Sequence, residues 1–125
     1  MADEKLMPSI LNSVKKNLNI LPEEEAFDSD ILLHINSVFS KLTQIGVGPE
    51  EGFYIEDETV TWDEYYTQVD LNMIRTYVYL EVRLLFDPPT ASVLTSMEKT
   101  RDELVWRLNV AADRPIDRTV QNDNQ

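Results

Sequence analysis

The side chains best suited to acid–base chemistry are His34, the only histidine, and Asp30, four residues before it. On a helix this spacing places the two side chains one turn apart, so the carboxylate can orient the imidazole and tune its proton. General-base catalysis also needs a substrate pocket and an orienting group, and no other motif supplies them. We interpret the pair as a local hydrogen bond on a helix surface and expect no catalytic residue.

A second polar group, Glu56, Asp57 and Glu58, offers the hard oxygen atoms that calcium and magnesium prefer. It lacks the alternating ligands and the distal glutamate of a calcium-binding loop. The chain contains no Gly-rich phosphate loop, no HExxH and no GxSxG motif. It also has no cysteine, which excludes disulfides and sulfur-ligated metal. The motifs therefore predict no enzyme and no metal or cofactor, and they favour a solvated acidic loop.

The net charge of −12 is concentrated in the amino-terminal part of the chain. Residues 1–70 hold 15 acidic and 4 basic side chains, whereas residues 71–125 hold 8 and 7. Such a surface repels a phosphate backbone, which disfavours sequence-specific nucleic-acid binding. Acidic walls would, however, let DNA slide through a channel without sticking, and the alternative is a surface that only aids solubility. We expect a protein made in the cytoplasm, because the sequence shows no signal peptide and no membrane span.

Four helices are predicted by apolar residues that recur every three or four positions. The first lies between Pro8 and Pro22, with Lys15 on its outer side. The second begins with a cap at Asp28 or Ser29 and ends at Gly46, where a left-handed backbone is expected. Between the second and third helices, the turn formers and carboxylates of residues 49–60 predict an acidic loop, and the alternation of Phe53, Ile55 and Val60 is compatible with a short extended or hairpin element there. 

The third helix, Ile74 to Phe86, is apolar around most of its circumference, so we expect other helices to enclose it. Substitution of Leu84 or Leu85 should then unfold the protein. A capping box at Thr61 and Glu64 precedes this helix, and the Asp87-Pro88-Pro89 stop leads into a fourth helix, residues 90–110.

The expected fold is all-α: a small bundle of about four helices in one domain, residues 1–112. Pro115 should end the last helix, which leaves residues 113–125 as an extended, flexible or partner-ordered tail. Arg114, Ile116 and Arg118 give this tail two cations and an apolar anchor. Among the aromatic residues, Trp62 is the best interface candidate, whereas Trp106 should cover the outside of the last helix.

Three segments together resemble the head-tail connector family of tailed bacteriophages, whose members are also called adaptor or head-completion proteins. They read SILNSVKKNLNI, FDSDILLHINSVFSKLTQIGVGPEEGF and YLEVRLLFDPPTASVLTSMEKTRDELVWRLN. The resemblance covers residues 8–110, and the GVGP turn and the RLLFDPP hairpin carry most of it. It implies a virion structural protein at the head-tail interface, or neck, made in the host bacterium. 

The resemblance also implies partners. Members form a homo-oligomeric ring of about twelve copies, that is, a dodecamer. The ring lies below the portal protein and above a downstream neck or tail-completion protein. Double-stranded DNA passes through the ring without sequence-specific binding, and no membrane is involved. By position in the family, Arg114, Ile116 and Arg118 become portal-docking candidates. The candidates for a channel or subunit-interface loop are Glu50, Glu51, Phe53, Ile55, Glu56, Asp57, Glu58 and Trp62.

A second hypothesis rests on charge alone. An acidic helical interaction module, or DNA mimic, would bind a basic partner as a monomer or dimer, and that binding would weaken with salt. Neither hypothesis requires a cofactor.

Overall fold

The computed structural model describes the backbone of residues 8–124 and the side chains of residues 8–113. Its elements are α1 (Ile10–Asn17), α2 (Asp28–Gln44), the 3-10 helix η2 (Trp62–Glu64), α3 (Leu71–Phe86) and α4 (Ala91–Asn124). Within this part of the chain the only β-pairing is an isolated bridge between Ser9 and Thr61. The prediction of a small all-α bundle is confirmed, and the acidic loop contains no hairpin.

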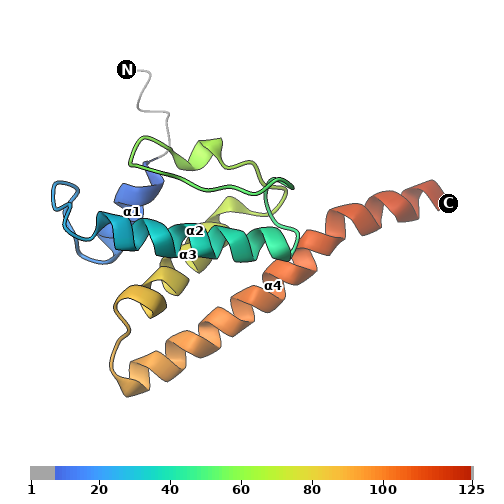
Figure 1. The fold of residues 1–125 in the computed structure, drawn as a ribbon. Coiled ribbons are helices and arrows are strands. Elements are labelled where there is room, and N and C mark those ends of the chain that lie inside the picture. Colours follow the sequence, from blue (N-terminus) through green and yellow to red (C-terminus); the bar gives the residue numbers. More distant parts are fainter. Residues whose placement is uncertain (1–7, 125) are drawn as a thin grey trace.

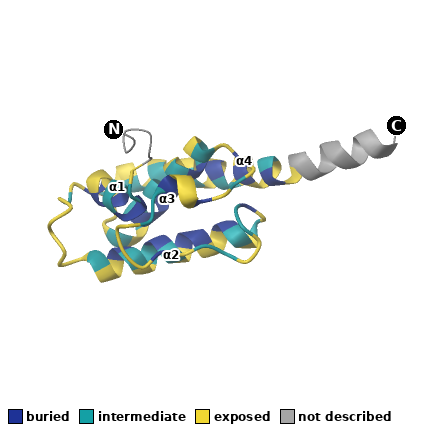
Figure 2. Ribbon diagram, turned by 90° about the horizontal axis from the view of Figure 1, so that it is seen from above, coloured by how far each residue is buried: buried dark blue, intermediate teal, exposed yellow. Residues whose placement is uncertain are grey.

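Helix α3 is the central element, because α1, α2 and α4 all pack against it. Figure 1 shows α4 crossing the bundle and extending beyond it. In the view of Figure 2, α2 lies on one side of the molecule, and α1 and α4 lie on the other. The expectation that helices enclose the third helix is confirmed. 

The buried face of α3 consists of Ile74, Tyr77, Val78, Glu81 and Val82, at the helical spacing that places side chains on one stripe. Asp70 begins the helix, and its side chain accepts a hydrogen bond of 3.2 Å from the N–H of Asn72. The apolar face thus determines the rotation of α3 about its own axis, and so which side chains point into the core.

The predicted importance of Leu84 and Leu85 is wrong. Leu84 is only half-buried and Leu85 is 44% exposed. Both residues lie in the last turn of α3, beyond the layers that Ile74 to Val82 form with neighbouring helices. Their substitution should therefore affect stability far less than a change at Val78 or Val82.

Lys15 was expected on the outside of α1, but its side chain is buried. Its ammonium group pairs with Asp28 Oδ1 at 2.7 Å and donates a hydrogen bond of 3.0 Å to the carbonyl oxygen of Pro22. The aliphatic stem can pack among apolar residues while the charge finds partners at the tip. Lys15 therefore holds the loop between α1 and α2 against the bundle.

The start of α2 also differs from the prediction, because Phe27 occupies the cap position and no side chain caps the helix. The end agrees: Gly46 has a φ of 89°. Gly48 has a φ of 87°, and the ring of Tyr65 lies where a Cβ atom would be. The GVGP turn thus depends on glycine both for its backbone conformation and for packing.

Helix α4 does not end near Val110 as expected but runs from Ala91 to Asn124, past Pro115. A proline removes one backbone hydrogen bond at a cost of about 3 kcal/mol, which the turns on either side can offset. The predicted extended backbone for residues 113–125 is therefore wrong up to Asn124. The side chains of Arg114, Ile116 and Arg118 lie outside the described residues, and their portal-docking role remains a prediction.

Candidate assembly surfaces

Trp62 is not an exposed interface residue but the largest fully buried side chain of the described core. Its indole Nε1–H donates a hydrogen bond of 2.8 Å to Ser13 Oγ. The rings of Phe39 and Tyr79 lie edge-on to it, each with a centroid distance of 6.1 Å. The interface prediction for Trp62 is wrong, because the capping-box turn directs the indole inward against α1 and α2.

Two other apolar residues of the acidic loop also face inward. Asn36 on α2 pairs with the backbone of Ile55 through hydrogen bonds of 2.8 and 2.9 Å, and only 2% of Ile55 is exposed. Phe53 is half-buried against Phe39 and Tyr65. Within the described surface, no exposed apolar patch is therefore formed by three of the subunit-interface candidates: Phe53, Ile55 and Trp62. This loop is anchored to the core by its apolar side chains.

The carboxylates of the same loop are exposed, as expected for a solvated acidic segment: Glu50, Glu51, Glu56, Asp57 and Glu58. Asp57 Oδ1 accepts hydrogen bonds from Thr59 Oγ1, at 2.6 Å, and from the Thr59 N–H, at 2.9 Å. These bonds, the side-chain one first, lower the pKa of the Asp57 carboxyl group. Asp57 therefore stabilises the turn in addition to adding charge.

Glu58 shares a groove with carboxylates from a different loop. It lines a groove of about 290 Å³ together with Glu23 and Glu25, which connect α1 to α2. We call Glu23, Glu25 and Glu58 the acidic patch. In the sequence these two loops are separate segments. Hydrophobic periodicity predicts helices and strands, but it does not predict which loops lie close together in the folded protein.

Several large apolar side chains are nevertheless exposed, and one of them, Tyr54, belongs to the acidic loop itself. Tyr54 and Tyr66 are each 71% exposed, Leu33 is 67% exposed and Trp106 is 66% exposed. The prediction that Trp106 covers the outside of the last helix is confirmed. Large exposed aromatic side chains are typical anchors of protein interfaces.

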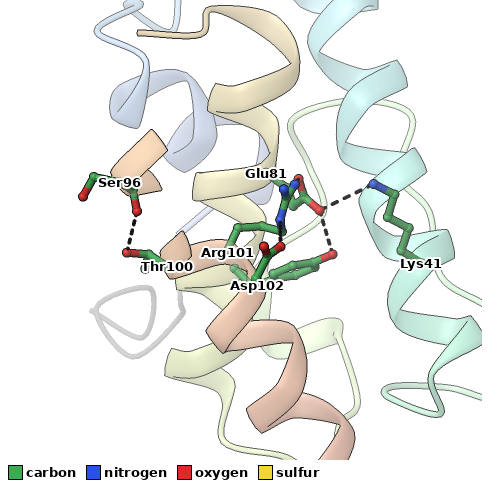
Figure 3. Close-up of polar contacts among 7 residues, drawn as sticks. Lys41, Glu81, Ser96, Thr100, Arg101 and Asp102 are labelled. Atoms are coloured by element: carbon green, nitrogen blue, oxygen red, sulfur yellow. Dashed lines mark hydrogen bonds and ion pairs between the residues drawn. The ribbon is translucent and has the colours of Figure 1, made fainter. Parts of the chain in front are cut away.

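Trp106 lies at a groove of about 680 Å³ between α2 and α4. Glu81, which is only 3% exposed, is another of its lining residues. Its carboxylate pairs with Lys41 Nζ at 3.4 Å and Arg101 Nη1 at 3.2 Å, and it accepts a hydrogen bond of 2.9 Å from the hydroxyl group of Tyr77 (Figure 3). The carboxylate thus joins α2, α3 and α4.

Burial raises the pKa of Tyr77 most, followed by the negative charge of Glu81 and the hydrogen bond to it, and together they outweigh the lowering effect of the Arg101 charge. The Tyr77 hydroxyl group therefore stays protonated and remains a donor to Glu81. Glu81 thus faces the neighbouring helices α2 and α4.

His34 and Asp30 do not form the expected hydrogen bond within the described part of the chain. The imidazole instead lies edge-on to the ring of Phe86, with a centroid distance of 6.3 Å, and Asp30 is exposed. In the residues that the structure describes, no cluster of three or more His, Asp or Glu side chains is placed to hold a metal. None of the described helices is both long and apolar enough to cross a membrane.

The family model for phage connector protein matches residues 10–115, from the first turn of α1 into the distal part of α4. No curated protein and no solved structure matched the chain. The matched region contains α1, α2, η2, α3 and all of the described core. The chain therefore belongs to the phage connector protein family.

Proposed function

We propose that this protein assembles as a ring of about twelve copies below the phage portal and joins the DNA-filled head to a downstream neck or tail-completion protein. The family match over residues 10–115 carries this proposal. Two structural features support it. The protomer has a complete core of its own, and it exposes aromatic side chains on separate elements, Tyr54 over α2 and Trp106 on α4.

Separate surfaces matter because a ring uses heterologous contacts, in which one face of a protomer meets a different face of the next. Each contact can be modest, since ring closure holds every protomer at high effective concentration. The ring joins the head to the tail through non-covalent contacts, so its function requires no covalent step.

Replacing Trp106 by alanine should weaken assembly at least tenfold with little effect on folding, because a 66% exposed side chain contributes mainly to contacts outside the protomer. Light scattering measures the assembly, and thermal unfolding followed by circular dichroism measures the fold. Lys99→Ala, at another exposed position of α4, is the control. Normal assembly of Trp106→Ala would exclude Trp106 from the ring contacts.

The portal-docking tail can be tested with the triple variant Arg114→Ala, Ile116→Ala and Arg118→Ala. We expect fewer copies on portal-bearing heads, because the variant lacks two guanidinium groups and the apolar anchor. Quantitative gel analysis of purified heads gives the copy number. Arg107→Ala, an exposed arginine earlier on α4, should bind like the wild type. Equal attachment of the triple variant would contradict the tail's role.

We place the acidic patch on the DNA channel, where its charge would keep the duplex from sticking to the wall. Neutralising it with Glu23→Gln, Glu25→Gln and Glu58→Gln should change DNA retention or ejection while leaving assembly intact. DNA release from filled particles, followed by nuclease digestion, measures the effect. Unchanged release and infectivity would favour a patch that only aids solubility.

A further inference from the structure

A groove formed by α1, α3 and α4 carries positive charge in a protein whose net charge is −12. Its two adjoining parts, of about 760 and 400 Å³, share Asn17 and Tyr79. Lys16, Arg75 and Arg83 are among its lining residues, and the described lining contains no carboxylate. We call this feature the basic groove. It contrasts with the acidic patch and with the acidic loop of residues 49–60.

The guanidinium group of Arg75 is held in place within the basic groove. Its Nε and Nη2 atoms donate hydrogen bonds of 3.1 and 3.0 Å to the Tyr79 hydroxyl group, and it stacks 5.5 Å from the centre of the Trp62 ring. Within the described part of the chain, neither Lys16 nor Arg75 forms an ion pair. Arg83 pairs with Asp87 at 4.0 Å, and its Nε atom donates a hydrogen bond of 2.7 Å to the Asp87 carbonyl oxygen, so a carboxylate of the next protomer would join an existing pair there. The groove is therefore organised to receive negative charge.

The rest of the lining is largely apolar and includes Ile20, Leu80 and Met97. Apolar walls with basic groups suit a segment that combines an aromatic anchor with carboxylates. A nucleic-acid duplex fits less well, because it contacts proteins mainly through its phosphates and would leave the apolar walls without a partner.

A segment of this kind is present on the same chain. Tyr54 is 71% exposed, and Glu50 and Glu51, which precede it in the same loop, are also exposed. We call these three residues the acidic knob. Tyr54 and Glu51 line a small groove with Asn36 and other residues of α2. Figure 2 shows α2 on the side of the molecule away from α1 and α4, so the knob and the basic groove belong to different faces.

We propose that the acidic knob of one protomer docks in the basic groove of the next copy of this chain. Tyr54 fills the apolar part of the groove, and the carboxylates of Glu50 and Glu51 face Lys16 and Arg83. Because the contact joins two different faces, it is heterologous, as ring closure requires. The inference rests on the proposed function, because in a closed head-to-tail ring the acidic knob of every protomer contacts the basic groove of its neighbour.

A charge exchange tests this contact. The groove variant is Lys16→Glu with Arg83→Glu, and the knob variant is Glu50→Lys with Glu51→Lys. Each variant alone should associate at least about tenfold more weakly than the wild type, because like charges then meet. A one-to-one mixture should regain assembly, since each groove then finds a knob of opposite charge in an alternating ring. Native mass measurement and electron microscopy follow the assemblies.

The control is Lys99→Glu with Arg107→Glu, which makes the same change in charge at exposed positions outside the groove lining. It should assemble like the wild type. Circular dichroism verifies that each variant folds. A mixture that fails to assemble although both variants are folded would overturn the contact. So would a groove variant that assembles normally but alters DNA retention, which would mean that the groove faces nucleic acid.

The absence of cysteine allows a second, independent measurement. A chain with Glu51→Cys and Asn17→Cys should form a ladder of disulfide-linked multimers under mild oxidation, whereas Glu51→Cys with Lys99→Cys should not. Failure of the first pair, in wild-type-like assemblies, would overturn this contact and leave the ring intact. Wild-type protein that forms no multimer, even with portal-bearing heads, would instead overturn the proposed function itself.

Discussion

Replacing Trp62 by alanine should lower the free energy of unfolding by about 4 kcal/mol, because a fully buried indole leaves a large cavity. The change also removes the hydrogen-bond donor to Ser13 Oγ and the edge-on contacts with Phe39 and Tyr79. Arg75 loses the ring on which its guanidinium group stacks. Chemical denaturation of the purified protein measures the effect.

Two further variants separate the contributions at Trp62. Trp62→Phe keeps most of the apolar volume but loses the Nε1–H donor. Ser13→Ala leaves that donor without its acceptor, which should cost about 1 to 3 kcal/mol. If Trp62→Ala folded with wild-type stability and failed only in assembly, Trp62 would be an interface residue and the burial described above would be wrong.

Replacing Glu81 by alanine is the second large change, with an expected loss of about 3 kcal/mol, near the lower end for breaking a buried ion pair. The value is at the lower end because Lys41 and Arg101 keep access to water, with side chains 48% and 27% exposed. The Tyr77 hydroxyl group, however, loses its acceptor in the protein interior. The carboxylate therefore stabilises the packing of three helices at one point.

The control for Glu81 is Lys41→Met, which removes only the more exposed partner and should cost less than about 1 kcal/mol. Glu81→Gln keeps an acceptor for Tyr77 and should fall between the two. A double-mutant cycle between Glu81 and Arg101 isolates their coupling. Equal stability of Glu81→Ala and the wild type would show that the network contributes no net stabilisation.

The helices could be predicted from the sequence because their apolar positions repeat and their ends carry local signals. Ile31, Ile35, Val38 and Leu42 follow the helical period of α2, and all four are buried. Gly46 adopts the left-handed backbone that its position indicates. Such signals act over a few residues, so they can be recognised without knowledge of the tertiary structure.

The surfaces were harder to predict because exposure depends on contacts between distant segments. Trp62 resembles an interface residue in sequence, yet Ser13 and Phe39, from two other helices, enclose it. Lys15 has a charged side chain of the kind usually found on the surface. It is buried because its ammonium group binds the carbonyl oxygen of Pro22 and the carboxylate of Asp28. Burial of these side chains follows from packing that no local pattern indicates.

Predictions from local sequence were also wrong about the end of the last helix at Pro115, and they did not show that the two acidic loops share a groove. A single proline predicts a helix end, but α4 continues beyond it. The acidic patch joins Glu58 to Glu23 and Glu25 through folding alone. The fold class and family therefore followed from the sequence, whereas the surfaces available to partners required the structure.

The most direct test of the account adds purified protein to DNA-filled heads that carry the portal but lack this protein. Electron microscopy of the portal vertex should then show one ring of about twelve copies, coaxial with the portal. Protein that stays monomeric or dimeric, leaves the portal vertex bare and binds a basic protein only at low salt would contradict the connector account. It would support a DNA mimic instead.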